Sequence, residues 1–216
     1  MSFTPIKTPW IAKKLFPNYI WDISTTEKVI YLTFDDGPTP EITDWVLNTL
    51  DIFNAKATFF CIGKNIEKHP DIFKNIIKKG HAIGNHTYDH LKGWKTNTEE
   101  YLLNINKAQN KIDSNYKTKP LLFRPPYGRI KLKQVNALSK LNYQIIMWNI
   151  LSKDWDKTIE KEVCLKNVIL NTKEGDIVVL HDSIKASRNM QYTLPRMLDH
   201  FTKEGYEFRR IPELTQ

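Results

Sequence analysis

Short apolar runs rich in β-branched and aromatic residues alternate with amphipathic stretches along nearly the whole chain. Each apolar run is typical of a buried strand, and each amphipathic stretch is typical of a helix that covers the strand. This alternation predicts a parallel sheet whose strands are joined by helical crossovers. We predict strands at residues 29–34, 57–62, 81–85, 121–123, 144–148, 176–180 and 207–209.

Helix starts are marked by capping residues and prolines. Thr39-Pro40-Glu41 begins one helix, and Pro70 begins another that ends at Gly80. Further helices are expected at residues 98–115, 131–140, 159–171 and 193–203. So many repeats in 216 residues predict a distorted (β/α) barrel of about seven parallel strands. An open doubly wound sheet stays the alternative, because periodicity alone does not decide whether a sheet closes.

The composition excludes several classes of protein. The formal charge is +8, but the lysines are scattered over amphipathic stretches, which indicates solvated helix faces and no nucleic-acid partner. Cys61 and Cys164 are too few for a disulfide framework. No glycine-rich phosphate loop follows a strand, so we expect no nucleotide cofactor. The chain has no signal-peptide core and no apolar run long enough to span a membrane, and we therefore expect a cytoplasmic protein.

Chemistry-bearing side chains follow most of the predicted strands. Asp35 and Asp36 come at the end of the first apolar run. Adjacent carboxylates repel each other, and a bound cation would relieve that repulsion; the alternative is a helix cap followed by a turn residue. The later strands end near His86, His90, Arg124, Asp154 and His181. Because the carboxyl ends of parallel strands meet at one edge, these side chains are expected to form a site there.

His86 and His90 are four residues apart, so a helical turn would place both imidazoles on one face. Two such histidines can share a metal ion, and a strand-end aspartate would complete the ligand set. Three protein ligands leave positions open for water and substrate, which is typical of a catalytic metal site. A divalent ion is therefore predicted, with Zn²⁺ favoured and Co²⁺, Ni²⁺ or Fe²⁺ also compatible.

Five motifs occur in a fixed order: Thr-Phe-Asp-Asp-Gly-Pro at 33–38, His-Thr-Tyr-Asp-His at 86–90, Arg-Pro-Pro-Tyr-Gly at 124–128, Asp-Trp at 154–155 and Leu-His-Asp at 180–182. Over residues 28–212 the chain resembles the polysaccharide deacetylase family, also called the NodB-homology family or carbohydrate esterase family four. The resemblance implies metal-dependent removal of N-acetyl groups from N-acetylglucosamine units. The expected substrate is an acetylated glycan of the peptidoglycan or chitin type.

The resemblance also implies a role for each motif residue. The metal ligands would be Asp36, His86 and His90. The general base would be Asp35, oriented by Arg124, and the general acid would be His181, tuned by Asp154. The oxyanion would be bound by the backbone N–H of Tyr127, and the acetyl methyl would lie between Trp155 and Val179. A monomer is expected, with a catalytic domain at 27–216 and an N-terminal extension at 1–26 packed on the barrel.

Two positions depart from the family pattern. Leu151 replaces an aspartate, and Val179 replaces a leucine beside the acetyl pocket. Losing one methylene there costs about 0.8 kcal/mol of burial. We expect Leu151 to alter substrate preference, and we interpret both departures as changes that tune the activity and do not abolish it. The alternatives keep the same site for an O-acetyl xylan esterase or a cyclic-amide hydrolase, or make the chain a glycan-binding pseudoenzyme.

Overall fold

A computed structural model describes residues 4–117 and 121–212. Within these ranges nine strands form one sheet, and every pairing between named strands is parallel. The strands are β1 (Tyr19–Ile20), β2 (Val29–Asp35), β3 (Thr58–Cys61), β4 (Ala82–Asn85), β5 (Leu121–Phe123), β6 (Tyr143–Ile146), β7 (Ile150–Leu151), β8 (Ile177–His181) and β9 (Glu207–Arg209). They lie in the order β1-β6-β5-β4-β3-β2-β8-β7, and β9 pairs with β2.

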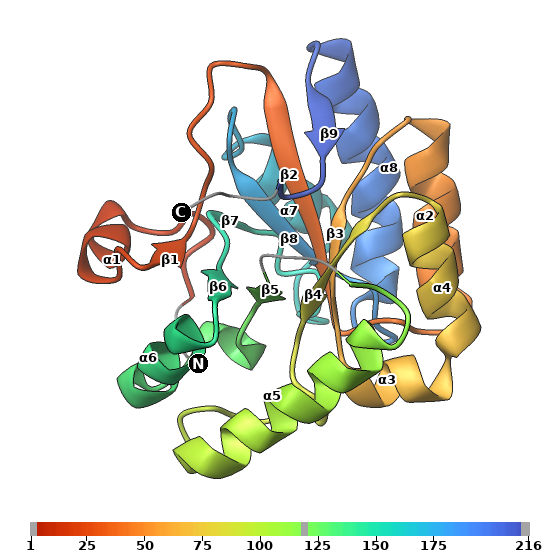
Figure 1. Cartoon of the computed structure of the whole chain (residues 1–216). Helices are drawn as coiled ribbons and strands as arrows, with labels where there is room; N and C mark the ends of the chain where they lie inside the picture. Colours follow the sequence, from red (N-terminus) through yellow and green to blue (C-terminus); the bar gives the residue numbers. More distant parts are fainter. Residues whose placement is uncertain (1–3, 118–120, 213–216) are drawn as a thin grey trace.

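The sheet curls into a distorted barrel (Figure 1). Strands β2 to β6 are sequential neighbours, so each crossover moves one place in the same direction. Strand β7 follows β6 in the chain but pairs with β8 at the other end of the order. The few residues between β6 and β7 therefore bring the two ends of the sheet near each other. The predicted barrel is confirmed. The doubly wound alternative is wrong, because that fold requires the direction of the crossovers to reverse and here it does not.

The N-terminal segment lies in the gap between the ends of the sheet. Lys7 forms an antiparallel bridge with Ile150, and the Thr8 N–H donates to the Asn149 carbonyl at 2.8 Å. Farther along this segment, β1 pairs with β6 on the other side of the gap. These contacts satisfy backbone groups that open strand edges would otherwise leave unpaired.

Helices cover the outside of the curled sheet (Figure 1). They are α1 (Trp10–Leu15), α2 (Ile42–Ile52), α3 (Gly63–Lys68), α4 (Pro70–Lys78), α5 (Thr98–Asp113), α6 (Leu132–Lys140), α7 (Lys161–Ile169) and α8 (Ser187–Lys203), with a 3₁₀ turn, η1, at Pro126–Gly128. All seven residues of β2 are buried. The largest apolar cluster packs β2, β3 and β8 against α2, α4 and α8. Burial on both faces explains why these strands are continuous apolar runs.

Some elements differ from the sequence prediction. The short strands β1 and β7 and the helices α1 and α3 were not predicted. Helix α2 begins at Ile42, after the Thr39-Pro40 turn, and α8 begins at Ser187, six residues before the predicted start at Thr193. Pro195 lies inside α8, although its ring favours a helix start. None of the helices in the described ranges is long and apolar enough to cross a membrane.

Candidate active site

The site lies where β2 and β8 run side by side to their carboxyl ends. Their register pairs Thr33 with Val179 and Asp35 with His181. Because side chains alternate across a strand, these four residues share the inner face of the barrel. The intervening Phe34 instead belongs to the outer apolar cluster. The strand pairing therefore places the predicted base and the predicted acid next to each other.

Arg124 holds the Asp35 carboxylate from inside the barrel. Its Nη1 donates to Asp35 Oδ1 at 2.7 Å and to the Thr33 hydroxyl at 2.8 Å. Its other nitrogens donate to the carbonyls of Ile146 and Met147, at 3.2 Å and 2.8 Å. The guanidinium is fully buried, and burial lowers its pKa although Asp35 opposes the shift. Five donors in a rigid plane are thus largely satisfied, which fixes the orientation of Asp35.

Asp36, His86 and His90 converge on one point, with one donor atom from each lying within 4.8 Å of the others. Asp36 Oδ1 is 3.2 Å from His90 Nε2 and 3.6 Å from His86 Nε2. This oxygen is buried and accepts no hydrogen bond from the residues that the structure describes. A buried carboxylate oxygen without a donor is costly unless a cation binds it. The three side chains therefore fit a divalent metal ion.

The protonation of His86 supports the same conclusion. Its Nδ1 donates to the Arg124 carbonyl at 2.8 Å, since a carbonyl can only accept. The bond leaves a lone pair on Nε2, the atom that faces Asp36, which is how metal-binding histidines are oriented. Burial lowers the pKa of His86 to about 4, so the imidazole is neutral at pH 7. Burial acts to raise the pKa of Asp36, but the neighbouring imidazoles outweigh it and lower this pKa.

The loop after β4 brings the two imidazoles together by a route that the sequence did not indicate. The predicted helical turn is wrong: no residue of 86–90 is helical, residues 88 and 89 form a bend, and φ is positive at Thr87 (64°) and His90 (57°). The ring centroids of His86 and His90 are nevertheless 5.1 Å apart. Backbone strain at two non-glycine residues replaces the helical geometry, as is common at functional sites.

His181 and Asp154 form a second charged pair. His181 Nδ1 donates to Asp154 Oδ1 at 2.8 Å, and the His181 backbone N–H donates to Oδ2 at 2.7 Å. Burial alone would lower the pKa of His181, but Asp154 outweighs it and raises this pKa to about 9. Trp155 packs edge-on against the imidazole, with ring centroids 4.9 Å apart. The imidazole is therefore a proton donor held in place at pH 7.

The remaining predicted residues border the same region. Tyr127 has left-handed backbone angles (φ 60°, ψ 10°), and its ring lies 4.7 Å from that of His90. Val179 is buried and is paired with Leu151 of β7. A cleft of about 460 Å³ opens beside Asp36 and His90. The structure thus brings together all ten residues that the motifs singled out.

Several further residues support the site. Thr33 shares the Arg124 donor, and the buried Asp182 accepts from the Gly37 N–H at 3.1 Å and from the Thr43 hydroxyl at 2.6 Å. A Cβ on Gly37 would lie 2.0 Å from Asp182 Oδ2, so only glycine fits there. Trp94 packs edge-on against Tyr127. Thr33 and Asp182 lie within the sequence motifs and could have been found from them. Trp94 lies in none of the motifs, so the sequence did not point to it.

Comparison with known proteins identifies similar chains. The polysaccharide deacetylase family model matches residues 22–146. A peptidoglycan-N-acetylglucosamine deacetylase of Bacillus cereus is 36% identical over 208 residues, covering 94% of this chain and 97% of the relative. A chitooligosaccharide deacetylase of Azorhizobium caulinodans is 34% identical, covering 74% and 76%. The crystal structure of the Bc1960 peptidoglycan N-acetylglucosamine deacetylase matches with a TM-score of 0.87 and 31% identity over 97% of both chains.

Proposed function

The chain belongs to the polysaccharide deacetylase family, and on that premise we propose that it hydrolyses the acetamido group of N-acetylglucosamine units in peptidoglycan- or chitin-like glycans. One observation carries the proposal: the cluster of Asp36, His86 and His90 lies at one edge of the barrel together with two ion pairs, Asp35 with Arg124 and Asp154 with His181. Amide hydrolysis needs an activated water, a stabilised oxyanion and a proton for the leaving amine. This edge offers a group for each requirement.

Asp36, His86 and His90 would hold the metal ion, for which we propose Zn²⁺. One carboxylate and two neutral imidazoles suit zinc, while Co²⁺, Ni²⁺ and Fe²⁺ accept the same donors. Zinc bound there would polarise the acetyl carbonyl and lower the pKa of a water molecule towards about 7.

Asp35 is proposed as the general base. The carboxylate takes the proton that the attacking water loses, and the hydrogen bond from Arg124 fixes the orientation of the carboxylate. The backbone N–H of Tyr127 is proposed to donate to the oxyanion that forms on the carbonyl oxygen.

His181 is proposed as the general acid. Its proton goes to the sugar nitrogen as the carbon–nitrogen bond breaks, which releases the amine and acetate. Asp154 keeps the imidazole charged until that step. Trp155 and Val179 are proposed to enclose the acetyl methyl group. The site uses residues of a single chain, so we propose an active monomer, with residues 27–216 as the catalytic domain and 1–26 as an extension packed on the barrel.

The test is acetate release from three substrates: N-acetylglucosamine oligomers, peptidoglycan fragments and acetylated xylan. Each is assayed before chelation, after chelation and after reloading with Zn²⁺, Co²⁺, Ni²⁺ or Fe²⁺. We expect release from the first two substrates that stops on chelation and returns with metal. Release from xylan alone would make the protein an O-acetyl esterase. No chelator-sensitive release from any substrate would make it a glycan-binding pseudoenzyme.

A further inference from the structure

Helix α1 presents its apolar side chains to solvent, the reverse of an ordinary surface helix. Trp10, Ile11 and Leu15 are 71%, 53% and 68% exposed, and no residue of α1 is buried. The side chain of Lys13, in contrast, is only 28% exposed. A helix that packs on a core normally turns its apolar face inward. The outward apolar face of α1 therefore needs another explanation.

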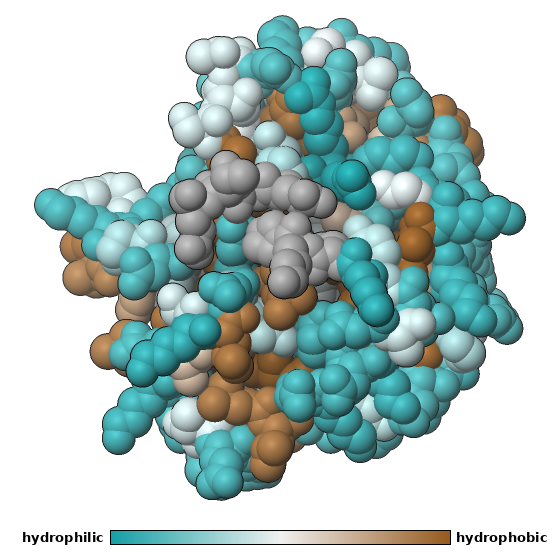
Figure 2. Space-filling model, viewed as in Figure 1, coloured by the Kyte–Doolittle hydropathy of each residue, from teal (hydrophilic) through white to brown (hydrophobic). Residues whose placement is uncertain are grey.

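The rest of the N-terminal segment holds α1 in this orientation. Lys13 forms an ion pair with Asp22, and the Phe16 ring stacks on that of Tyr19 at 5.3 Å. The Trp21 indole N–H donates to the Phe16 carbonyl at 3.3 Å. In Figure 2 the lobe at the left, where Figure 1 places α1, carries hydrophobic side chains beside hydrophilic ones. The apolar face is thus part of an anchored structure.

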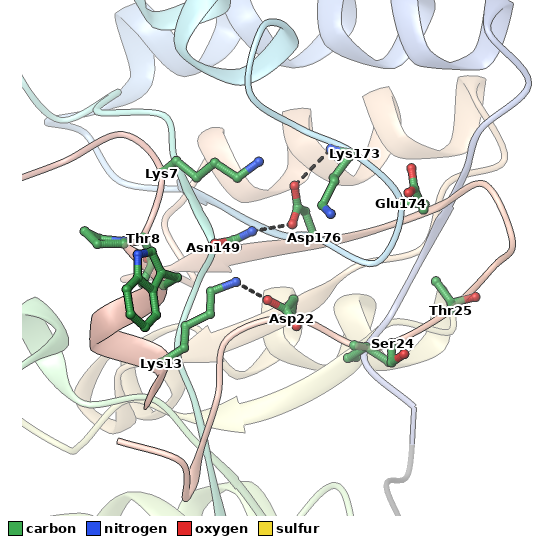
Figure 3. A pocket seen from close by; sticks show the side chains of 13 residues that line it. Lys7, Thr8, Lys13, Asp22, Ser24, Thr25, Asn149, Lys173, Glu174 and Asp176 are labelled. Atoms are coloured by element: carbon green, nitrogen blue, oxygen red, sulfur yellow. Dashed lines mark hydrogen bonds and ion pairs between the residues drawn. The ribbon is translucent and has the colours of Figure 1, made fainter. Parts of the chain in front are cut away.

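A polar cavity of about 640 Å³ lies beside this face (Figure 3). Lys7 and Lys13 line it from the N-terminal segment, and Lys173 lines it from the loop before β8. Its two aspartates already have partners: Asp22 pairs with Lys13, and Asp176 accepts from Asn149 and from the Lys173 backbone N–H. Glu174 completes the charged lining.

Three further ammonium groups near α1 form no ion pair within the described ranges, although Lys7 Nζ donates to the Asn171 carbonyl at 3.1 Å and Lys14 Nζ lies 5.9 Å from the centroid of the Trp10 ring. Among the residues that the structure describes, no carboxylate pairs with Lys7, Lys14 or Lys173. All three residues are exposed. The apolar face is therefore bordered by three exposed ammonium groups, with the exposed Glu174 carboxylate next to Lys173.

We propose that the outer face of α1, together with Lys7, Lys14 and Lys173, docks on an anionic membrane surface. Trp10, Ile11 and Leu15 enter the boundary between headgroups and acyl chains, and the lysines bind lipid phosphates. This combination of Trp, aliphatic residues and lysine is typical of helices that lie in the membrane interface. Three apolar side chains can bury much less surface area than the ~800 Å² that each partner buries in a stable protein interface. A two-fold dimer would also bring the lysines of the two copies together.

The fold gives this docking a direction. The cavity is lined by residues that precede β2 and β8, such as Ser24 and Asp176, so it lies at the amino ends of the strands. The candidate active site lies at the carboxyl ends, where Asp35 and His181 stand. Docking through α1 therefore leaves the active-site edge free of the bilayer.

Vesicle flotation of the full chain tests the proposal. We compare vesicles of phosphatidylcholine alone with vesicles of equal parts phosphatidylcholine and phosphatidylglycerol. The wild type is expected to bind the anionic vesicles at least about tenfold more tightly. Trp10→Ser/Leu15→Ser should weaken that binding by about tenfold or more, because it removes the inserted apolar groups. Lys7→Gln/Lys173→Gln should weaken binding to the anionic vesicles only.

Matched variants separate docking from general effects of the substitutions. Ile52→Ser removes an equally exposed apolar side chain (79%) on α2, and Lys133→Gln removes an exposed charge on α6; both should bind as the wild type does. An unchanged melting temperature establishes that each variant is folded. Equal vesicle binding by the wild type and the Trp10/Leu15 variant would overturn the proposal. So would a wild-type dimer in lipid-free buffer that this variant makes monomeric, because the face would then bind a second copy.

Discussion

At the residue scale, the backbone gives the adjacent carboxylates Asp35 and Asp36 different partners. Asp35 ends β2 in an extended conformation and meets Arg124 inside the barrel. Asp36 has a φ of 81°, which turns its side chain towards His86 and His90. Their mutual repulsion is therefore offset by two separate sites, a guanidinium for one and the proposed cation for the other.

The first prediction concerns Asp35→Asn. The variant should lose turnover by about 10²–10⁴-fold, because an amide cannot accept the water proton. It should still bind one metal ion per chain, since Asp36, His86 and His90 are untouched. Acetate release and metal stoichiometry by elemental analysis measure the two effects.

Asp199→Asn on α8 is the matched control for this variant. It removes an exposed carboxylate that pairs with Lys203 one helical turn away, and it should keep wild-type turnover. Wild-type turnover in Asp35→Asn would place the base elsewhere. Loss of the metal from that variant would make Asp35 a ligand.

The second prediction concerns Asp154→Asn and the pH dependence of kcat/KM. The wild-type imidazole of His181 stays protonated up to a pKa of about 9. Without the Asp154 charge, burial is no longer outweighed, and this pKa falls to its ordinary value near 6.5 or below. A general acid must be protonated, so the alkaline limb of the profile should move down by roughly two pH units. Asp156→Asn, which changes a half-buried carboxylate two residues away, should leave the limb in place. An unmoved limb in Asp154→Asn would exclude His181 as the acid.

At the element scale, the turn after β2 depends on a contact with the residue after β8. The third prediction is that Gly37→Ala destabilises the fold by about 1–3 kcal/mol, because the new Cβ overlaps the Asp182 carboxylate. The turn also carries Asp36, so metal affinity should fall with stability. Urea unfolding and metal titration measure both losses.

A double-mutant cycle isolates the contact between Gly37 and Asp182. In an Asp182→Ala background the overlap is gone, and Gly37→Ala should then cost clearly less than in the wild type. Equal costs in the two backgrounds would mean that the glycine is needed for another reason.

The sequence predicted those elements whose packing requires a recognisable pattern of apolar side chains. Strands β2 and β8 are buried on both faces, so they read as continuous apolar runs. Strands β1 and β7 are two residues long and arise from backbone pairing across the gap, which leaves no side-chain pattern. Helix α8 continues past Pro195 because Met190, Leu194 and Leu198 bury one apolar face, and that burial outweighs the missing N–H.

The candidate site was likewise predicted only in part. The sequence alone placed its residues at strand ends, because parallel strands end at one edge. It could not predict the bend that joins His86 to His90, since positive φ at Thr87 depends on tertiary contacts. Nor could it predict that the Asp182 carboxylate would accept from Gly37 N–H, because that bond joins residues 145 positions apart.

At the scale of the whole molecule, the N-terminal segment connects the closure of the barrel to the orientation of Asp35. Ile20 pairs with Ile146 in β6, and its carbonyl accepts from the Met147 N–H at 2.7 Å. The carbonyls of Ile146 and Met147 in turn accept from Arg124, which holds Asp35. Ile146, the last residue of β6, and Met147 after it are therefore held by β1 on one side and by Arg124 on the other.

The fourth prediction is that a chain beginning at Glu27 is both less stable and less active. Losing the partial burial of Tyr19, Ile20 and Trp21 costs about 1 kcal/mol each, which lowers the melting temperature by roughly 6–12 °C. Turnover measured well below that temperature should also fall, because Arg124 loses the fixed carbonyls that orient it. Deleting only residues 1–5 keeps the bridge at Lys7 and should change neither quantity. An unchanged melting temperature in the longer deletion would mean that the barrel closes without this segment. Full turnover in that deletion would mean that the orientation of Arg124 does not depend on the segment.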